Sequence, residues 1–148
     1  MWRRFTIPLL ILGCIALLAL ILTRIEADDR VRVDFDAVSV AVDVADTPEL
    51  RQQGLSGSEA LDEDEGMLFV FNEPNKVSFH MLDMNFALDI IWLDEELKVV
   101  DIAAGITPET YPESFKPITP AKYVLEVHSG FAAQHGISLG SQATIAGL

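Results

Sequence analysis

The sequence of 148 residues contains little basic charge and almost no cysteine. Ten lysine and arginine residues stand against 23 aspartate and glutamate residues, so the formal net charge is −13. A protein that neutralises nucleic-acid phosphates needs a basic surface, so this balance argues against nucleic acid as a partner. The single cysteine, Cys14, excludes an internal disulfide and a zinc site built from cysteines.

Motifs for cofactors and nucleophiles are also missing. No glycine-rich phosphate loop follows a predicted strand, and no serine lies in a nucleophile elbow. Nine glycines, seven prolines and 50% apolar residues are typical of a folded globular chain rather than a fibrous or disordered one. The length is about that of one domain. The sequence therefore predicts one folded domain, and no cofactor is expected.

The first 27 residues contain the long hydrophobic run of the chain. Residues 5–22 carry no charge and follow Arg3 and Arg4. About 20 apolar residues span a bilayer core, whereas the apolar region of a cleaved signal peptide is usually about 7–15 residues long. The run therefore favours an uncleaved N-terminal transmembrane helix over a cleaved signal peptide. The arginine pair predicts that the N-terminus stays in the cytoplasm.

We therefore expect residues 28–148 to form an extracytoplasmic domain at the cytoplasmic membrane, facing the periplasm or the extracellular side. After residue 24 the chain has 7 basic and 23 acidic side chains, a net charge of −16. This charge favours a hydrated, soluble surface, and a cation-binding surface is the alternative interpretation. Anionic headgroups repel such a surface, so contact with the inner membrane is expected through the anchor alone.

Alternating or continuous apolar runs predict a succession of strands. The alternation changes phase at Asp36–Ala37, which predicts a turn or bulge there. Asp94, Glu95 and Glu96 form the predicted turn of a later hairpin. The predicted strands cover residues 31–36, 38–44, 66–71, 77–81, 87–93, 97–106, 123–127 and 142–145.

Two short helices interrupt these strands. Thr47 and Pro48 are typical of a helix start, and Gly54 is expected to end that helix. Ser129 is the predicted cap of a second helix over residues 131–135. This order predicts a mainly β fold, either a small antiparallel β-sandwich or a partly open, jelly-roll-like barrel, preceded by the transmembrane helix.

Four sequence blocks occur in a recognisable order over residues 38–145. They are Ala45-Asp46-Thr47 with Arg51 and Gly54-Leu55; Gly66 to Phe71; Ser78-Phe79 with Met81 and Leu88 to Ile91; and Val124 to Val127 with Gly130 and Gly136. These blocks resemble the DUF192 family, also called UPF0127. The resemblance implies a small β-sandwich related to jelly rolls, often behind a signal or anchor. It implies no established activity.

The chain departs from the family pattern in the central block and at the end of the Gly-Leu-Met block. The central block of the family usually reads Phe-Trp-Met-Lys-Asn-Thr, and here His80 replaces the tryptophan and Met84 the threonine. The Gly-Leu-Met block ends in Ser56 instead of methionine. If the family binds a ligand through those side chains, the resemblance implies a changed or lost specificity in this chain.

Polar side chains on or near the predicted strands are the candidates for a site. A ligand-binding groove is predicted near residues 80–86, because methionine and aromatic side chains form adaptable contact surfaces. Its predicted residues are His80, Asp83, Met84, Asp89 and Glu126. The structural alternative pairs the Arg51 guanidinium with Asp89 or Glu126, because buried carboxylates usually need a partner.

These candidates favour a binding module of the cell envelope over an enzyme. Its ligand or partner protein is not identified by the sequence. The catalytic alternative is a metal-assisted hydrolase, in which His80, His128, Asp89 and Glu126 surround one pocket. No pair of histidines has the close spacing of a metal motif, so the fold would have to bring these four residues together. A purely structural role in assembly is a third hypothesis.

Overall fold

The computed structural model describes residues 30–148. The predicted membrane anchor within residues 1–27 lies outside the described residues. No helix between residues 30 and 148 is both long enough and apolar enough to cross a membrane.

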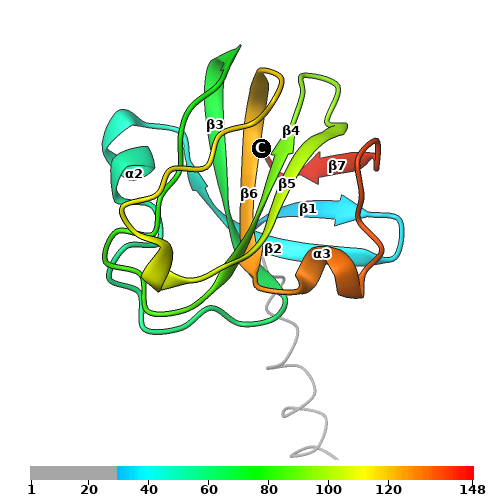
Figure 1. Ribbon diagram of the computed structural model, residues 1–148. Helices are drawn as coiled ribbons and strands as arrows, with labels where there is room; N and C mark the ends of the chain where they lie inside the picture. Colours follow the sequence, from blue (N-terminus) through cyan, green and yellow to red (C-terminus); the bar gives the residue numbers. More distant parts are fainter. Residues whose placement is uncertain (1–29) are drawn as a thin grey trace, which may run out of the picture.

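Seven strands form one sheet that curls into a half-barrel (Figure 1). Their order across the sheet is β5-β4-β6-β3-β2-β1-β7. The mainly β fold and its two short helices are thus confirmed. The strands are β1 (Val31–Phe35), β2 (Val38–Ala45), β3 (Glu65–Asn75), β4 (Leu88–Leu93), β5 (Val99–Ile106), β6 (Ala121–His128) and β7 (Ala143–Ala146). The helices are α2 (Pro48–Gln53), α3 (Phe131–Gln134) and the 3₁₀ turn η1 (Pro108–Thr110).

The sheet is not wholly antiparallel, contrary to the sequence-based expectation. Strands β2 and β3 pair in parallel, with Val42 opposite Gly66. A parallel pair needs a crossover, and residues 46–64 with helix α2 provide it. The remaining neighbours are antiparallel. The two edges of the sheet approach each other, because the amide of Val99 donates to the carbonyl of Ser141 at 2.9 Å.

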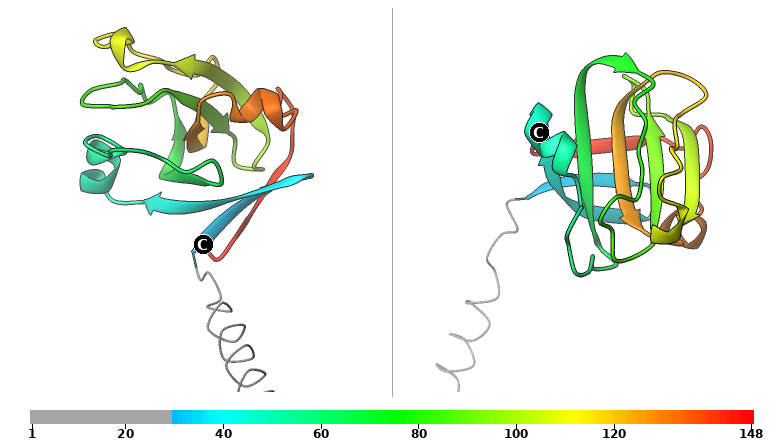
Figure 2. Two further views of the ribbon diagram at one scale, coloured as in Figure 1. Left: turned by 90° about the horizontal axis from the view of Figure 1, so that it is seen from below. Right: turned by 60° about the vertical axis from the view of Figure 1, so that its left-hand side comes forward.

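The curl separates two hydrophobic clusters on opposite faces of β3, β4 and β6. Inside, the layer of β1, β2 and β7 crosses the other strands, as Figure 2 shows. Alternate residues fill this core, including Val33, Leu68, Ile91, Leu125 and Val127. The outer face carries a second cluster with Phe69, Phe79, Ile90, Trp92 and Val124. The loops on either side of β3 cover this outer face, and the candidate site lies there.

Gly66 allows β3 to pack closely between its neighbours. A Cβ atom at this position would lie 2.7 Å from the carbonyl oxygen of Glu126, and 3.2 Å from side-chain carbons of Val40 and Val127. Contacts this short force the neighbouring chain to move. The glycine thereby sets the spacing between β3 and β6, the strand that carries Glu126.

The first helix is capped as predicted, and the second is not. Thr47 Oγ1 accepts the amide of Leu50 at 3.2 Å, and Gly54 ends α2 with a φ of 53°. The predicted cap at Ser129 is wrong, since Gly130 precedes α3 and supplies no capping side chain. The carboxylate of Asp89 on β4 accepts the amide of Ala132 instead. The amide of Ala132 in α3 is thus satisfied by a residue distant in the sequence and not by a local cap.

Residues 77–81 do not form the predicted strand. Phe79 makes one isolated bridge with Phe115, through two hydrogen bonds of 2.8 Å. Phe79 and Met81 are buried while His80 is exposed, but Val77 is exposed too, so the predicted alternation holds only over residues 79–81. It arises because this loop lies on the sheet and turns Phe79 and Met81 inward.

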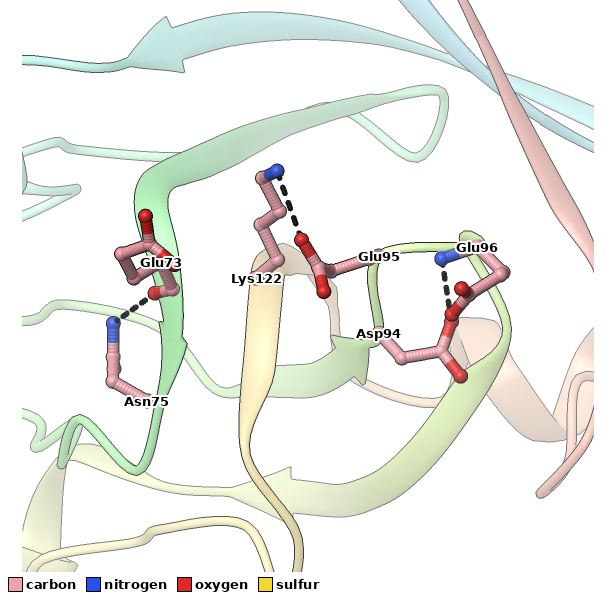
Figure 3. Close-up of polar contacts among 6 residues, drawn as sticks. All are labelled: Glu73, Asn75, Asp94, Glu95, Glu96 and Lys122. Carbon is pink, nitrogen blue, oxygen red and sulfur yellow. Dashed lines mark hydrogen bonds and ion pairs between the residues drawn. The ribbon is translucent and has the colours of Figure 1, made fainter.

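Polar contacts fix the ends of several strands (Figure 3). The carboxylate of Asp94 accepts the amides of Glu96 and Lys98, which confirms the predicted turn between β4 and β5. Lys122 at the start of β6 pairs with Glu95 of that turn at 3.2 Å. Exposed ion pairs of this kind contribute little stability. This pair connects the start of β6 to the turn between β4 and β5.

Candidate functional site

A pocket of about 220 Å³ opens on the outer face of the sheet. It lies between the end of α2 with the residues that follow it, strand β3, the loop over residues 77–84, and β6. Its lining residues are Arg51, Gln52, Gln53, Gly54, Leu55, Ser56, Phe69, Phe71, Val77, Ser78, Phe79, His80, Met84 and Glu126. The walls thus combine aromatic and aliphatic side chains with about as many polar ones, and small-molecule sites use such polar groups to orient a ligand.

Glu126 is the buried acid of this pocket. It lies on β6 opposite Met67 of β3 and Ile90 of β4, and shares a sheet face with Val124. The residue is 6% exposed. Its carboxyl group makes no hydrogen bond or ion pair with any residue from 30 to 148. Burial raises the pKa of Glu126 to about 8, because the charged form loses its hydration.

Arg51 lines the same pocket but bonds to backbone carbonyls. Its Nη1 donates to the carbonyl oxygen of Asp46 at 2.6 Å and to that of Val70 at 2.8 Å. Its guanidinium carbon lies 5.2 Å from the centre of the Phe71 ring. In the described part of the chain it forms no ion pair with Asp89 or Glu126. The predicted pair is absent because helix α2 directs Arg51 to the backbone of β3.

Asp89 lies on the face of the sheet opposite to Glu126. In the β4–β6 register, Asp89 is opposite Val127, whereas Glu126 is opposite Ile90. Asp89 is 0% exposed, and three backbone N–H groups donate to its carboxylate. They belong to Gly105 at 2.8 Å, Gly130 at 3.1 Å and Ala132 at 3.0 Å. Asp89 therefore has a structural role instead of the predicted ligand-binding one. Its carboxylate connects β4 to β5 and to α3.

The altered central block contributes two of its three candidate residues to the pocket. His80 and Met84 line it. The ring of His80 lies 5.9 Å from the ring of Tyr111, and its Nδ1 accepts the amide of Leu82 at 3.4 Å. Asp83 is not among the lining residues, and forms a turn with a φ of 54°. The structure thus brings together His80, Met84 and Glu126 of the five predicted ligand-binding residues.

The four residues of the hydrolase hypothesis are divided among different places. His128 lines a separate cavity of about 430 Å³ with His135, Glu63 and Asp64. Asp89 is enclosed by backbone amides, and only His80 and Glu126 share the pocket described above. Between residues 30 and 148, no three histidine, cysteine, aspartate or glutamate side chains form a group that could hold a metal ion.

The sequence did not identify the aromatic walls of the pocket. Phe69 and Phe71 belong to an apolar run that predicts only a buried strand, and Phe79 to a predicted strand that is a loop. One sequence signal does coincide with the site. Three of the positions that depart from the family pattern, Ser56, His80 and Met84, line this pocket, whereas Leu82 and Asp83 of the central block do not.

Comparison with known proteins gives a family match and two similar structures. The model of the DUF192 family, described as "Uncharacterized ACR", matches residues 30–145. A Sinorhizobium meliloti 1021 protein, described as a proposed transcription regulator, is 29% identical with a TM-score of 0.73. The match covers 80% of this chain and 94% of that one. A Novosphingobium aromaticivorans DSM 12444 protein of unknown function is 29% identical with a TM-score of 0.71, over 77% and 82% of the two chains. No curated protein matches the chain.

Proposed function

The chain belongs to the DUF192 family, and we propose that its domain is a non-catalytic module that binds a small organic ligand in the pocket above Glu126. The observation that carries this proposal is the buried carboxyl group of Glu126, which lines the pocket without a partner between residues 30 and 148. A buried polar group without a hydrogen bond is unfavourable, so a bound ligand is a natural source of the missing one.

The size of the pocket supports a small ligand. Its volume of about 220 Å³ is below the range of roughly 300–1,000 Å³ that is common for drug-sized molecules. The Sinorhizobium protein is described as a transcription regulator, a role that would require contact with DNA. The acidic composition of this chain opposes binding to DNA phosphates.

We expect His80→Ala and Met84→Ala each to weaken ligand binding about tenfold, because both side chains line the pocket. Three probes of similar shape and different charge test this: benzylamine, benzyl alcohol and benzoate. Equilibrium dialysis of the full chain in a non-ionic detergent, against a detergent blank, measures their binding. His128→Ala is the matched control, since this exposed histidine lines the other cavity. Failure of all three probes to bind, or equal binding by the His80, Met84 and His128 variants, would contradict the proposal.

We also propose that the N-terminal segment holds the domain at the cytoplasmic membrane, on the periplasmic or extracellular side. The uncharged run of residues 5–22 behind Arg3 and Arg4 supports this. The full chain is expected to stay in the membrane pellet after carbonate extraction, and its domain to be digested by protease added to intact spheroplasts. A chain without residues 2–24 is expected in the soluble fraction. Extraction of the full chain by carbonate would overturn the anchor.

A further inference from the structure

The buried carboxyl groups of Asp89 and Glu126 differ in their hydrogen-bond partners. Asp89 accepts three backbone N–H groups, so its negative charge is compensated inside the protein. Glu126 receives none from the described residues, although it is only 6% exposed. An ionised carboxylate at this depth needs a positively charged or strongly donating partner. Because Glu126 lines the pocket, a partner for its carboxyl group can enter there.

The walls of the pocket suit a cation with an apolar body. Phe69 and Phe79 meet edge to face, with ring centroids 4.9 Å apart, and both line the cavity with Phe71. The face of an aromatic ring carries partial negative charge and attracts cations. The ring of Phe71 already attracts one cation, since the Arg51 guanidinium carbon lies 5.2 Å from its centre.

We propose that the ligand is a small organic ammonium ion, whose charged nitrogen pairs with Glu126 and whose apolar body lies against the phenylalanine rings. This inference rests on the binding function proposed above and names its ligand class. The excess of acidic side chains on the chain favours the approach of a cation. A ligand with one positive charge is preferred to a diamine, because the positively charged Arg51 also lines the pocket and would repel a second charge.

The protonation of Glu126 gives this class of ligand a distinctive pH dependence. Arg51 and His80 are the other charged or titratable groups that line the pocket. Because burial raises the pKa of Glu126 to about 8, an ammonium ion that binds below that pH displaces a proton. Its affinity should therefore rise about tenfold for each pH unit up to about 8. A neutral ligand that accepts a hydrogen bond from the protonated acid should lose affinity above that pH.

Benzylamine, benzyl alcohol and benzoate separate these cases, because they share a ring and differ in charge. Binding to the full chain is measured at about pH 6, 7 and 8, where benzylamine stays protonated. We expect benzylamine to bind at least tenfold more tightly than the other two at pH 8, with the stated rise from pH 6. Glu126→Gln should remove that preference, and Glu113→Gln, which changes an exposed acid in a loop, should retain it.

The outcomes distinguish this inference from the proposed function. If benzyl alcohol or benzoate binds as well as benzylamine, and His80→Ala weakens that binding, the pocket is a binding site but the ammonium class is wrong. If benzylamine binds equally to wild type and Glu126→Gln, the contact is elsewhere and the inference is overturned. If none of the three probes binds, the proposed function fails as well. Circular dichroism of Glu126→Gln verifies that this variant is folded.

Discussion

Replacing Glu126 with glutamine is expected to stabilise the protein at pH 7 by about 3 kcal/mol. Burial raises the pKa of this carboxyl group from 4.5 to about 8. Between these values the folded protein retains a proton that the unfolded chain has released, so stability falls as the pH rises through this window. Each pKa unit corresponds to about 1.4 kcal/mol, so the full loss above pH 8 approaches about 5 kcal/mol. The neutral amide of glutamine does not have this penalty.

Urea unfolding of both proteins at about pH 4.5, 6, 7 and 8 measures this effect. The difference between them should be smallest at pH 4.5 and grow toward pH 8, and this comparison cancels the titration of all other acids. Glu113→Gln, at an exposed position, should follow the wild type at every pH. A constant difference between Glu126→Gln and the wild type would show that the carboxyl group titrates normally in the folded state.

Local sequence signals predicted turns and helix ends correctly, because residues close in the sequence determine these features. The phase change at Asp36–Ala37 marks the turn between β1 and β2, and Thr47 and Gly54 mark the two ends of α2. The alternation of apolar residues also assigned Glu126 and Val124 to one face of β6. What these signals lacked was the identity of the neighbouring strands. The parallel pairing of β2 with β3 depends on a crossover that no residue pattern encodes.

The site could be predicted only in part, for the same reason. Strand parity placed Asp89 and Glu126 among polar residues of a sheet, but their relative orientation depends on the β4–β6 register. In that register they point to opposite faces, and the backbone amides that satisfy Asp89 come from residues 16, 41 and 43 positions away. The phenylalanines that line the pocket cannot be distinguished from core residues by sequence alone. Departure from the family pattern was a useful signal at Ser56, His80 and Met84, which line the pocket, but not at Leu82 and Asp83, which do not.

The second large effect is expected at Asp89, whose carboxylate joins three segments of the chain. Asp89→Ala removes the shared acceptor of the Gly105, Gly130 and Ala132 amides, of which that of Ala132 belongs to a buried residue. Hydrogen bonds to a charged group contribute about 1.5–3 kcal/mol each, so we expect a loss of about 3–5 kcal/mol in the free energy of unfolding. Such a loss is a large fraction of the stability of an ordinary domain.

Asp89→Asn should have a smaller effect, which tests the geometry itself. Oδ1 accepts the amides of Gly105 and Gly130, and Oδ2 accepts that of Ala132. The single oxygen of asparagine can replace Oδ1, but its amide group then faces the Ala132 N–H as a second donor. We expect a loss of about 1–3 kcal/mol and faster hydrogen exchange at Ala132 than at Gly105. Asp43→Asn, at an exposed strand position, is the control. Equal stability of Asp89→Asn and wild type would contradict this account, because one of the three bonds cannot form in that variant.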